Sequence, residues 1–452
     1  MPTYSYLPLR YDDSIRVIEL SRGTNEDSSV HCNITRRRLS DPILSYEAIS
    51  YTWGDPLALE ILFCGGHNAE LSITRNCYNA LRSLRRSDKS RTIWIDAICI
   101  NQKNILERSS QVRIMDRIYS FASRVVAYLG EETPGSQLLF DELVEADSLY
   151  EVTQSFEGRP WPNAELAHEL DNLFRRPWFS RIWVIQEVCV AREVIMVCGT
   201  SYASMVALFE CALGYLNRRV TISSIPVSVL AAIYGSSGWR TGDAATSIWK
   251  LLADTRECGA TDRRDKIFAL KALVEDDQRE LDQLIDYSRS IERVFNDVTM
   301  LLLPRVRLWL LLAVRHPHTL KMPSWMPDWS GKSTPNITWN LGDVPLANAK
   351  EEFMISQLKC SHTECIGQHT ILHVQGIQHS RITHLGVPLD FEGAEESCYQ
   401  ALHHAIPELE VPGLRPACGN SCRDILPPPI FEGKWNTNFL WISRLFVVTD
   451  VK

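Results

Sequence analysis

One carboxylate lies in the middle of an apolar run and could do chemistry there. The run RIWVIQEVCVA (181–191) is apolar on nearly every side of a helix, except at Glu187. Burying a carboxylate is costly unless it is paired or opens into a water-filled cleft. The residues favour an ion pair with an arginine of FRRPWFSR (174–181) or with Arg108. The alternative is a carboxylate that is held in a pocket to stabilise a cation or to activate a hydroxyl.

Polar and aromatic residues also follow two short apolar runs, where a ligand site would form. AISYT (48–52) leads into a Trp-Gly-Asp-Pro turn, and TIWID (92–96) ends in a carboxylate. Ligands of an open parallel sheet bind beyond the carboxyl ends of its strands. The residues expected at this edge are Tyr51, Trp53, Gly54, Asp96, Cys99, Asn101 and Gln102. In the alternative interpretation, Asp96 caps a turn and Trp53 only packs the loop.

Other polar groups along the chain have simpler explanations. Glu107 and Arg108 lie at the polar border of a predicted helix, near enough to Asn101 and Gln102 for a contact across the same cleft. Capping of a helix N-terminus explains the acidic residues of TDRRDKIFAL (261–270). The late cysteines and histidines are spaced too loosely for structural zinc, so no metal site is predicted. The sequence has no phosphate-binding, dinucleotide-binding, serine-hydrolase or metalloprotease motif.

These residues need a scaffold, and the first 200 residues have the alternating strand and helix pattern of an α/β domain. Three apolar or nearly apolar runs are typical of strands buried in a parallel sheet: AISYT (48–52), TIWID (92–96) and RVVAYL (124–129). Two β-like runs, at 61–64 and 71–74, predict a hairpin inserted after the first of these strands. Residues 131–162 are polar and punctuated by Gly and Pro, and we interpret them as an insertion.

The chain of 452 residues is long enough for about three average domains. The patterns divide it into an N-terminal extension (1–40), an α/β domain (41–200), a mainly helical region (201–320) and a β-rich or irregular C-terminal region (321–452). In the α/β domain we expect a parallel sheet flanked by helices.

The composition excludes several classes of protein. With 45% hydrophobic and 23% charged residues, the chain is typical of a globular protein. Its formal charge of −8 argues against a nucleic-acid binder, which would carry a basic surface. The richest apolar run, 300–314, is interrupted by proline and arginine, so no membrane span is predicted. Thirteen cysteines, mostly isolated in apolar runs, indicate buried thiols in a reducing compartment, and we expect a cytoplasmic protein.

Three blocks of the sequence resemble the heterokaryon incompatibility (HET) domain of filamentous fungi. They are YEAISYTWGDP (46–56), RTIWIDAICINQKNILERSSQVRIMDRIYSFASRVVAYLG (91–130) and RRPWFSRIWVIQEVCVAREVIMVCG (175–199). Their order, spacing and residue types agree with the family. Four further stretches that recur in such fungal proteins extend the resemblance over most of the chain: 256–270, 286–295, 323–330 and 374–377. Family members usually continue past SRLFVVTD (443–450), so we expect a shortened or inactive member.

The resemblance implies a role in allorecognition, in which a cell-death reaction follows the fusion of genetically different hyphae. HET domains are similar to TIR domains, which implies a flavodoxin-like or TIR-like fold. Some TIR domains hydrolyse NAD through a glutamate on a helix, and RIWVIQE (181–187) resembles that part of the TIR signature. By this correspondence Glu187 is the candidate catalytic residue, with Trp183 one turn earlier. NAD is then a candidate substrate, and no cofactor is required.

The hypothesis is therefore an intracellular effector of incompatibility and programmed cell death that binds a protein partner or associates with itself. The candidate ligand-binding residues are Tyr51, Trp53, Gly54, Asp96, Asn101, Gln102, Arg108 and Trp183. Two alternatives stay open. In the first, the same edge of the sheet binds a partner protein without turnover. In the second, the chain is an enzyme or an accessory protein of fungal specialised metabolism.

Overall fold

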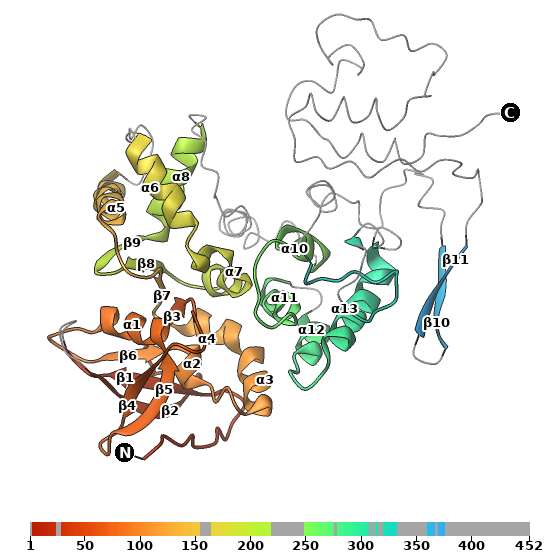
Figure 1. The fold of residues 1–452 in the computed structure, drawn as a ribbon, viewed down its shortest axis with the longest axis horizontal. Coiled ribbons are helices and arrows are strands. Elements are labelled where there is room, and N and C mark those ends of the chain that lie inside the picture. Colours follow the sequence, from red (N-terminus) through yellow and green to blue (C-terminus); the bar gives the residue numbers. More distant parts are fainter. Residues whose placement is uncertain are drawn as a thin grey trace, which may run out of the picture. The chain divides into compact units, whose positions relative to one another are not determined.

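The computed structural model describes most of the first 331 residues and one hairpin beyond them (Figure 1). The described residues are 2–23, 29–153, 164–217, 248–274, 278–306, 310, 313–314, 320–331, 359–366 and 369–375. The chain divides into two units, the first of residues 1–333 and 341–349 and the second of residues 334–340 and 350–452. The candidate site lies in the first unit.

Nine strands of the first unit form one mixed sheet. They are β1 (Ser14–Leu20), β2 (Val30–Arg38), β3 (Glu47–Tyr51), β4 (Leu59–Cys64), β5 (Ala69–Thr74), β6 (Arg91–Trp94), β7 (Arg124–Tyr128), β8 (Val194–Cys198) and β9 (Ser201–Ser204). Their order across the sheet is β5-β4-β2-β1-β6-β3-β7-β8-β9. The predicted parallel arrangement is found in β6-β3-β7-β8, whose neighbouring strands are all parallel.

The sheet extends beyond this parallel part with strands that pair mostly antiparallel, whereas β2 and β4 pair in parallel. β1 lies between β2 and β6 and is antiparallel to both. Six of its seven residues are buried, and other strands flank it on both edges, so it is an inner strand covered on both faces of the sheet. Residues that we assigned to an N-terminal extension therefore supply two strands of the same sheet as the α/β domain. The predicted hairpin is confirmed, since β4 and β5 pair antiparallel from Leu59↔Thr74 to Cys64↔Ala69.

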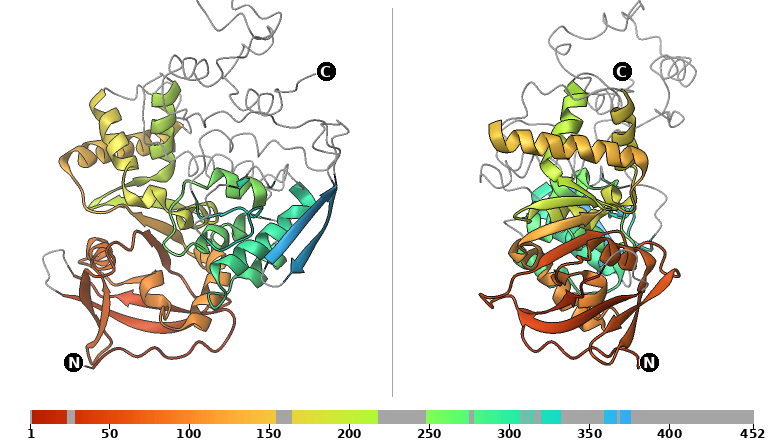
Figure 2. Two further views of the ribbon diagram at one scale, coloured as in Figure 1. Left: turned by 45° about the vertical axis from the view of Figure 1, so that its right-hand side comes forward. Right: turned by 90° about the vertical axis from the view of Figure 1, so that its left-hand side faces the viewer.

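Helices connect and cover the strands of this sheet. They are α1 (Arg75–Leu84), α2 (Asp96–Cys99), α3 (Ile105–Arg113), α4 (Met115–Phe121), α5 (Pro134–Thr153), α6 (Ala164–Phe174), the 3-10 helix η1 (Pro177–Ser180), α7 (Ile182–Cys189) and α8 (Met205–Asn217). Figures 1 and 2 show α5, α6 and α8 gathered next to β8 and β9.

The segment that we interpreted as a polar insertion is largely a helix of the core. Of residues 131–162, the part from Pro134 to Thr153 forms α5. Leu139, Phe140 and Leu143 on this helix are at most 1% exposed and pack in one hydrophobic cluster with residues of α6 and α8. The apolar residues of α5 recur at helical spacing, and the surrounding polar residues masked that periodicity in the sequence.

The predicted helical region continues the first unit. It contains α10 (Ile248–Asp254), α11 (Asp265–Phe268), the 3-10 helix η2 (Lys271–Leu273), α12 (Gln278–Leu284) and α13 (Ile291–Val306). Hydrogen bonds join it to the sheet domain: the Arg113 guanidinium donates to the Ile285 carbonyl at 2.7 Å, and the Lys271 ammonium donates to the Arg113 carbonyl at 2.8 Å. Among the helices that the structure describes, none has the length and apolar character needed to cross a membrane.

The second unit contains a described hairpin of β10 (Lys359–Ile366) and β11 (His369–Gln375), which pair antiparallel. This hairpin lies within residues 321–452, the C-terminal region that we expected to be β-rich or irregular. The remaining residues of that region, including the strand-like end at 446–449, lie outside the described residues.

Candidate functional site

A proline and an arginine set the start of the helix that carries the candidate catalytic residue. Pro177 ends the preceding helical segment and opens η1, because a proline cannot continue a helix from the turn before it. Arg181 then adopts an extended conformation, with φ −80° and ψ 135°, immediately before α7. This extended residue turns α7 so that Glu187 faces the carboxyl end of β3.

The Glu187 carboxylate is buried in a network of hydrogen bonds. Its side chain is 2% exposed, and Oε2 accepts a short hydrogen bond from the Ser50 hydroxyl on β3. The Ser50 oxygen in turn accepts from the indole Nε1 of Trp178 at 2.8 Å. The Ser50 hydroxyl is thereby oriented by one partner to donate to the other, and it replaces water around the carboxylate.

Arg181 supplies the positive charge next to this carboxylate. Its Nη1 lies 4.0 Å from Glu187 Oε2 and donates a short hydrogen bond to the Tyr51 carbonyl. This arrangement confirms the ion pair that we favoured between Glu187 and an arginine of residues 174–181. The alternative prediction, an ion pair between Glu187 and Arg108, is wrong. The Arg108 guanidinium instead lies 3.6 Å from the Tyr287 ring centroid and 3.6 Å from the Asp262 carboxylate.

Burial and charge act in opposite directions on the two carboxyl groups near Arg181. Burial raises the pKa of Glu187 above its ordinary value, although the positive charge of Arg181 and the Ser50 hydrogen bond oppose that shift. Burial also raises the pKa of Asp96, although the positive charge of Arg181 opposes that shift as well. Arg181 is therefore the positive charge near both carboxyl groups, and for neither of them does it fully offset the effect of burial on the pKa.

Asp96 occupies the carboxyl end of β6, as expected. Its Oδ2 accepts from the Trp53 indole at 2.8 Å, and its Oδ1 accepts from the Ala97 backbone amide at 2.7 Å. Gly54 has a φ of +75°, and a Cβ there would lie 2.7 Å from the Asn76 side chain. Both observations agree with the simpler interpretation, in which Asp96 begins a helical turn and Trp53 closes the loop against it.

The structure brings only part of the predicted site together. Tyr51 and Asp96 share Arg181 as a neighbour with Glu187, and Trp53 joins this group through its hydrogen bond to Asp96. The Tyr51 ring is itself buried, so only its backbone carbonyl meets the guanidinium.

The remaining predicted residues face elsewhere. The Gln102 amide donates to the Asp96 backbone carbonyl at 2.9 Å. The Asn101 amide N–H donates to Glu107 at 2.7 Å. The Trp183 side chain hydrogen-bonds to Asp265 of the helical region. None of these three side chains contributes to the surroundings of Glu187, and Trp183 instead joins α7 to α11.

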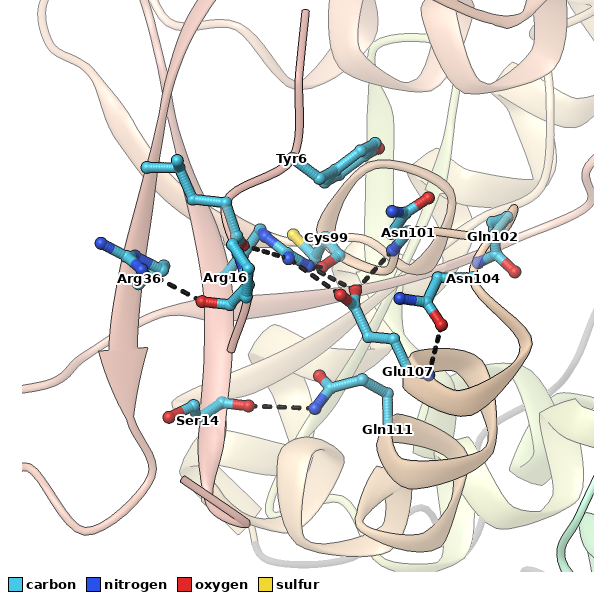
Figure 3. A network of polar contacts seen from close by, with 12 residues as sticks. Tyr6, Ser14, Arg16, Arg36, Cys99, Asn101, Gln102, Asn104, Glu107 and Gln111 are labelled. Carbon is cyan, nitrogen blue, oxygen red and sulfur yellow. Dashed lines mark hydrogen bonds and ion pairs between the residues drawn. The ribbon is translucent and has the colours of Figure 1, made fainter. Parts of the chain in front are cut away.

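A second buried ion pair, which the sequence analysis did not single out, joins β1 to α3 (Figure 3). The Arg16 guanidinium binds both carboxylate oxygens of Glu107, at 2.6 and 3.0 Å, and donates to the carbonyls of Cys99 at 2.9 Å and Leu7 at 2.7 Å. The Arg16 side chain is 1% exposed. A charged residue inside the apolar run SIRVIEL was the available signal, and it is the same signal that drew attention to Glu187.

Asp265 titrates in the range of physiological pH, and we expect its titration to affect stability. Burial raises the pKa of this carboxyl to about 6, although hydrogen bonds from Tyr287 and Trp183 lower it. Because the folded pKa lies above the ordinary value of 3.8, the folded protein binds more protons than the unfolded chain between these values. The contribution of Asp265 to stability is therefore full below about pH 4 and is lost as the pH rises through about 6.

The test compares the wild type with Asp265→Asn by urea unfolding across this pH range. We expect the free energy of unfolding of the wild type, relative to that of the variant, to fall by up to about 3 kcal/mol between about pH 4 and pH 7, since each pKa unit corresponds to about 1.4 kcal/mol. A difference that does not change with pH would contradict the raised pKa.

Fold and site together define an α/β domain with a mixed sheet and a polar network, centred on the buried Glu187, at the carboxyl ends of β3 and β6. Residues 46–187 match the family model "Heterokaryon incompatibility protein (HET)", and this stretch covers α7 up to Glu187. The chain therefore contains a HET domain, over residues 46–187. β1 and β2 precede the matched residues although they belong to the same sheet.

One curated relative extends the similarity beyond the HET domain. The chain is 25% identical over 397 residues to heterokaryon incompatibility protein 6, OR allele, of Neurospora crassa. The match covers 70% of this chain and 58% of the relative, so the chain spans less than two thirds of that protein's length. No solved structure matches the chain.

Proposed function

We propose that the chain acts in fungal heterokaryon incompatibility, as an effector of allorecognition that leads to cell death. The match of residues 46–187 to the HET family carries this proposal. The similarity to a relative named as a heterokaryon incompatibility protein supports it, because that similarity covers 70% of the chain, more than the matched HET residues alone. The effector acts in the cytoplasm, through a protein partner or through self-association.

Induced expression of the chain in a fungal host tests this proposal. We expect growth arrest and loss of viability after induction, whereas a chain with a disrupted HET core has no effect. Trp178→Ala provides that core disruption, since the Trp178 side chain is 1% exposed and orients Ser50. Normal growth at high levels of the wild-type protein would remove the support for an effector of cell death.

We further propose that the domain is TIR-like, with a flavodoxin-like fold, and that Glu187 acts in the cleavage of the nicotinamide–ribose bond of NAD. That cleavage passes through an oxocarbenium-like state, which a nearby carboxylate stabilises. Nicotinamide leaves as a neutral pyridine, so no acid has to protonate it. Water then adds to the ribosyl carbon and releases one proton, which gives ADP-ribose. The position of Glu187 beside Ser50, at the carboxyl end of a parallel strand, favours this role.

In the described conformation the carboxylate is inaccessible to such a substrate. Glu187 is 2% exposed and accepts a hydrogen bond from Ser50. Catalysis therefore requires a state in which α7 or its neighbours move and uncover the carboxylate.

Nicotinamide release from NAD by the purified protein tests the enzymatic proposal. We expect release by the wild type under conditions of self-association or partner binding, and its loss in Glu187→Gln. Glu193→Gln is the matched control, because Glu193 follows the same helix but is exposed. If the wild type and Glu187→Gln are equally inactive in every assembly state, the HET domain acts as an interaction module. Small molecules that copurify with the chain would favour specialised metabolism instead.

A further inference from the structure

The helical region contacts the sheet domain at the residue that pairs with Glu187. The Ile182 amide donates to the Gly259 carbonyl at 3.0 Å, and the Gly259 amide donates to the Ser180 carbonyl at 2.5 Å. These two bonds form a parallel bridge between Arg181 and Gly259. The backbone of Arg181 is therefore held from the helical region, while its guanidinium holds Glu187.

A buried lysine fixes the segment that leads to this bridge. The Lys266 side chain donates to the carbonyl of Arg256 at 2.7 Å and, in a shorter bond, to that of Cys258. Lys266 is only 6% exposed. Because Cys258 immediately precedes Gly259, the ammonium group sets the position of the bridging residue.

A second contact reaches α7 one turn before Glu187. The Asp265 carboxylate hydrogen-bonds to the Trp183 side chain and accepts from the Tyr287 hydroxyl at 2.5 Å. The Tyr287 amide donates to Ser109 Oγ on α3 at 3.0 Å. Asp265 is thus tied both to α7 and, through Tyr287, to the sheet domain.

The helical region is anchored independently of α7, which makes it able to restrain that helix. Lys271 is 7% exposed and bonds to the Arg113 carbonyl at 2.8 Å, and its ammonium lies 2.8 Å from Asp282 and 3.4 Å from Asp116. The restraint on α7 therefore comes from a segment that is itself joined to α3 and α4.

We propose that residues 256–274 and 278–287 form a clamp that holds α7 in the closed position and keeps the Glu187 carboxylate buried. The clamp consists of the Gly259 bridge and the Asp265–Trp183 contact. Its release, by a protein partner or by self-association, uncovers the Glu187 carboxylate and so switches the domain from the closed to the open state. This inference rests on the proposed function of Glu187 for its biological role, but the mechanical coupling between the clamp and α7 can be measured without any activity.

Hydrogen exchange of the full chain measures that coupling directly. In Lys266→Met, which removes the ammonium that positions Cys258 and Gly259, we expect the amides of residues 182–190 to exchange at least tenfold faster. The amides of β7 (124–128) should keep their wild-type rates, which shows that the sheet is intact. Lys250→Met is the matched control, because Lys250 lies on α10 in the same region with a side chain 44% exposed, and its exchange should equal that of the wild type.

Trp183→Phe is a second and milder variant, which keeps an aromatic ring but removes the indole N–H that meets Asp265, together with the ring that carries it. This variant still tests the proposal if Lys266→Met does not fold. In Trp183→Phe we expect the amides of residues 182–190 to exchange several-fold faster than in the wild type. If both folded variants exchange at the wild-type rate in α7, the clamp does not exist.

Activity then separates the clamp from the enzymatic proposal. If exchange in α7 accelerates and NAD is cleaved, with loss of cleavage in Lys266→Met/Glu187→Gln, both proposals stand. If exchange accelerates and no nicotinamide is released, the clamp stands as a restraint on α7 and the hydrolysis of NAD by Glu187 is overturned.

Discussion

Replacing Arg181 with leucine is expected to lower the free energy of unfolding by about 3–5 kcal/mol, since removing one partner of a buried ion pair leaves the other charge uncompensated. Here the guanidinium lies 4.0 Å from Glu187 and also lowers the pKa of Asp96. Its loss leaves two carboxyl groups without their counter-charge and the Tyr51 carbonyl without a donor. Denaturant unfolding followed by tryptophan fluorescence measures the loss.

Arg175→Leu is the control for this substitution. Arg175 lies in the same segment and pairs with Asp171 at 2.7 Å, but its side chain is 61% exposed. Exposed pairs contribute about 0–1 kcal/mol, so this variant should differ little from the wild type. If the two variants lose similar amounts of stability, Arg181 does not carry the electrostatic role that its position indicates.

The pH dependence of the Arg181→Leu variant gives an independent check. Without the guanidinium, the pKa of Glu187 rises further above its ordinary value, because burial is no longer opposed. A raised folded pKa means that stability is lost as the pH rises through the interval between the unfolded and folded pKa values. The variant should therefore recover part of the lost stability on acidification, and Arg181→Leu/Glu187→Gln should recover part of it at neutral pH.

The parallel part of the sheet could be predicted because its strands are buried on both faces. Such strands are continuous apolar runs, and the runs around Ile49, Ile93 and Val126 are of this kind. β1 was missed because polar residues interrupt it, and its place depends on pairing with β6 more than 70 residues later. The sequence SIRVIEL alone does not indicate that its arginine, Arg16, forms an ion pair with a glutamate on α3.

The ion pair at Glu187 could be predicted for a different reason. A carboxylate in an apolar helix requires a counter-charge, and three arginines, at 175, 176 and 181, lie just before that helix. The roles of Ser50 and Trp178 could not be inferred, since they depend on how η1 packs against β3 in three dimensions. Trp183 was assigned to the ligand site by its correspondence with the TIR signature, whereas its side chain contacts α11.

The Arg16–Glu107 pair connects three segments that are distant in sequence, so its loss should affect all of them. Glu107 Oε1 also accepts from the Asn101 amide at 2.7 Å, and Arg16 also holds the Leu7 carbonyl. The Arg16 guanidinium lies 4.9 Å from the Tyr6 ring centroid. The N-terminal residues are thereby held against β1 and against the turn that precedes α3.

Glu107→Leu is expected to cost about 3–5 kcal/mol of stability, because Arg16 stays buried with its charge unpaired. The unpaired Arg16 guanidinium should move toward solvent and break its hydrogen bond to the Leu7 carbonyl. The amide hydrogens of residues 2–8 should therefore exchange faster. Glu60→Leu is the control, since its partner Arg75 is 61% exposed and little should change. In Arg16→Met/Glu107→Leu both charges are removed, so most of the stability should return. A double variant no more stable than Glu107→Leu would show instead that the hydrogen bonds to the Cys99 and Leu7 carbonyls, and not the charge pair, hold these segments together.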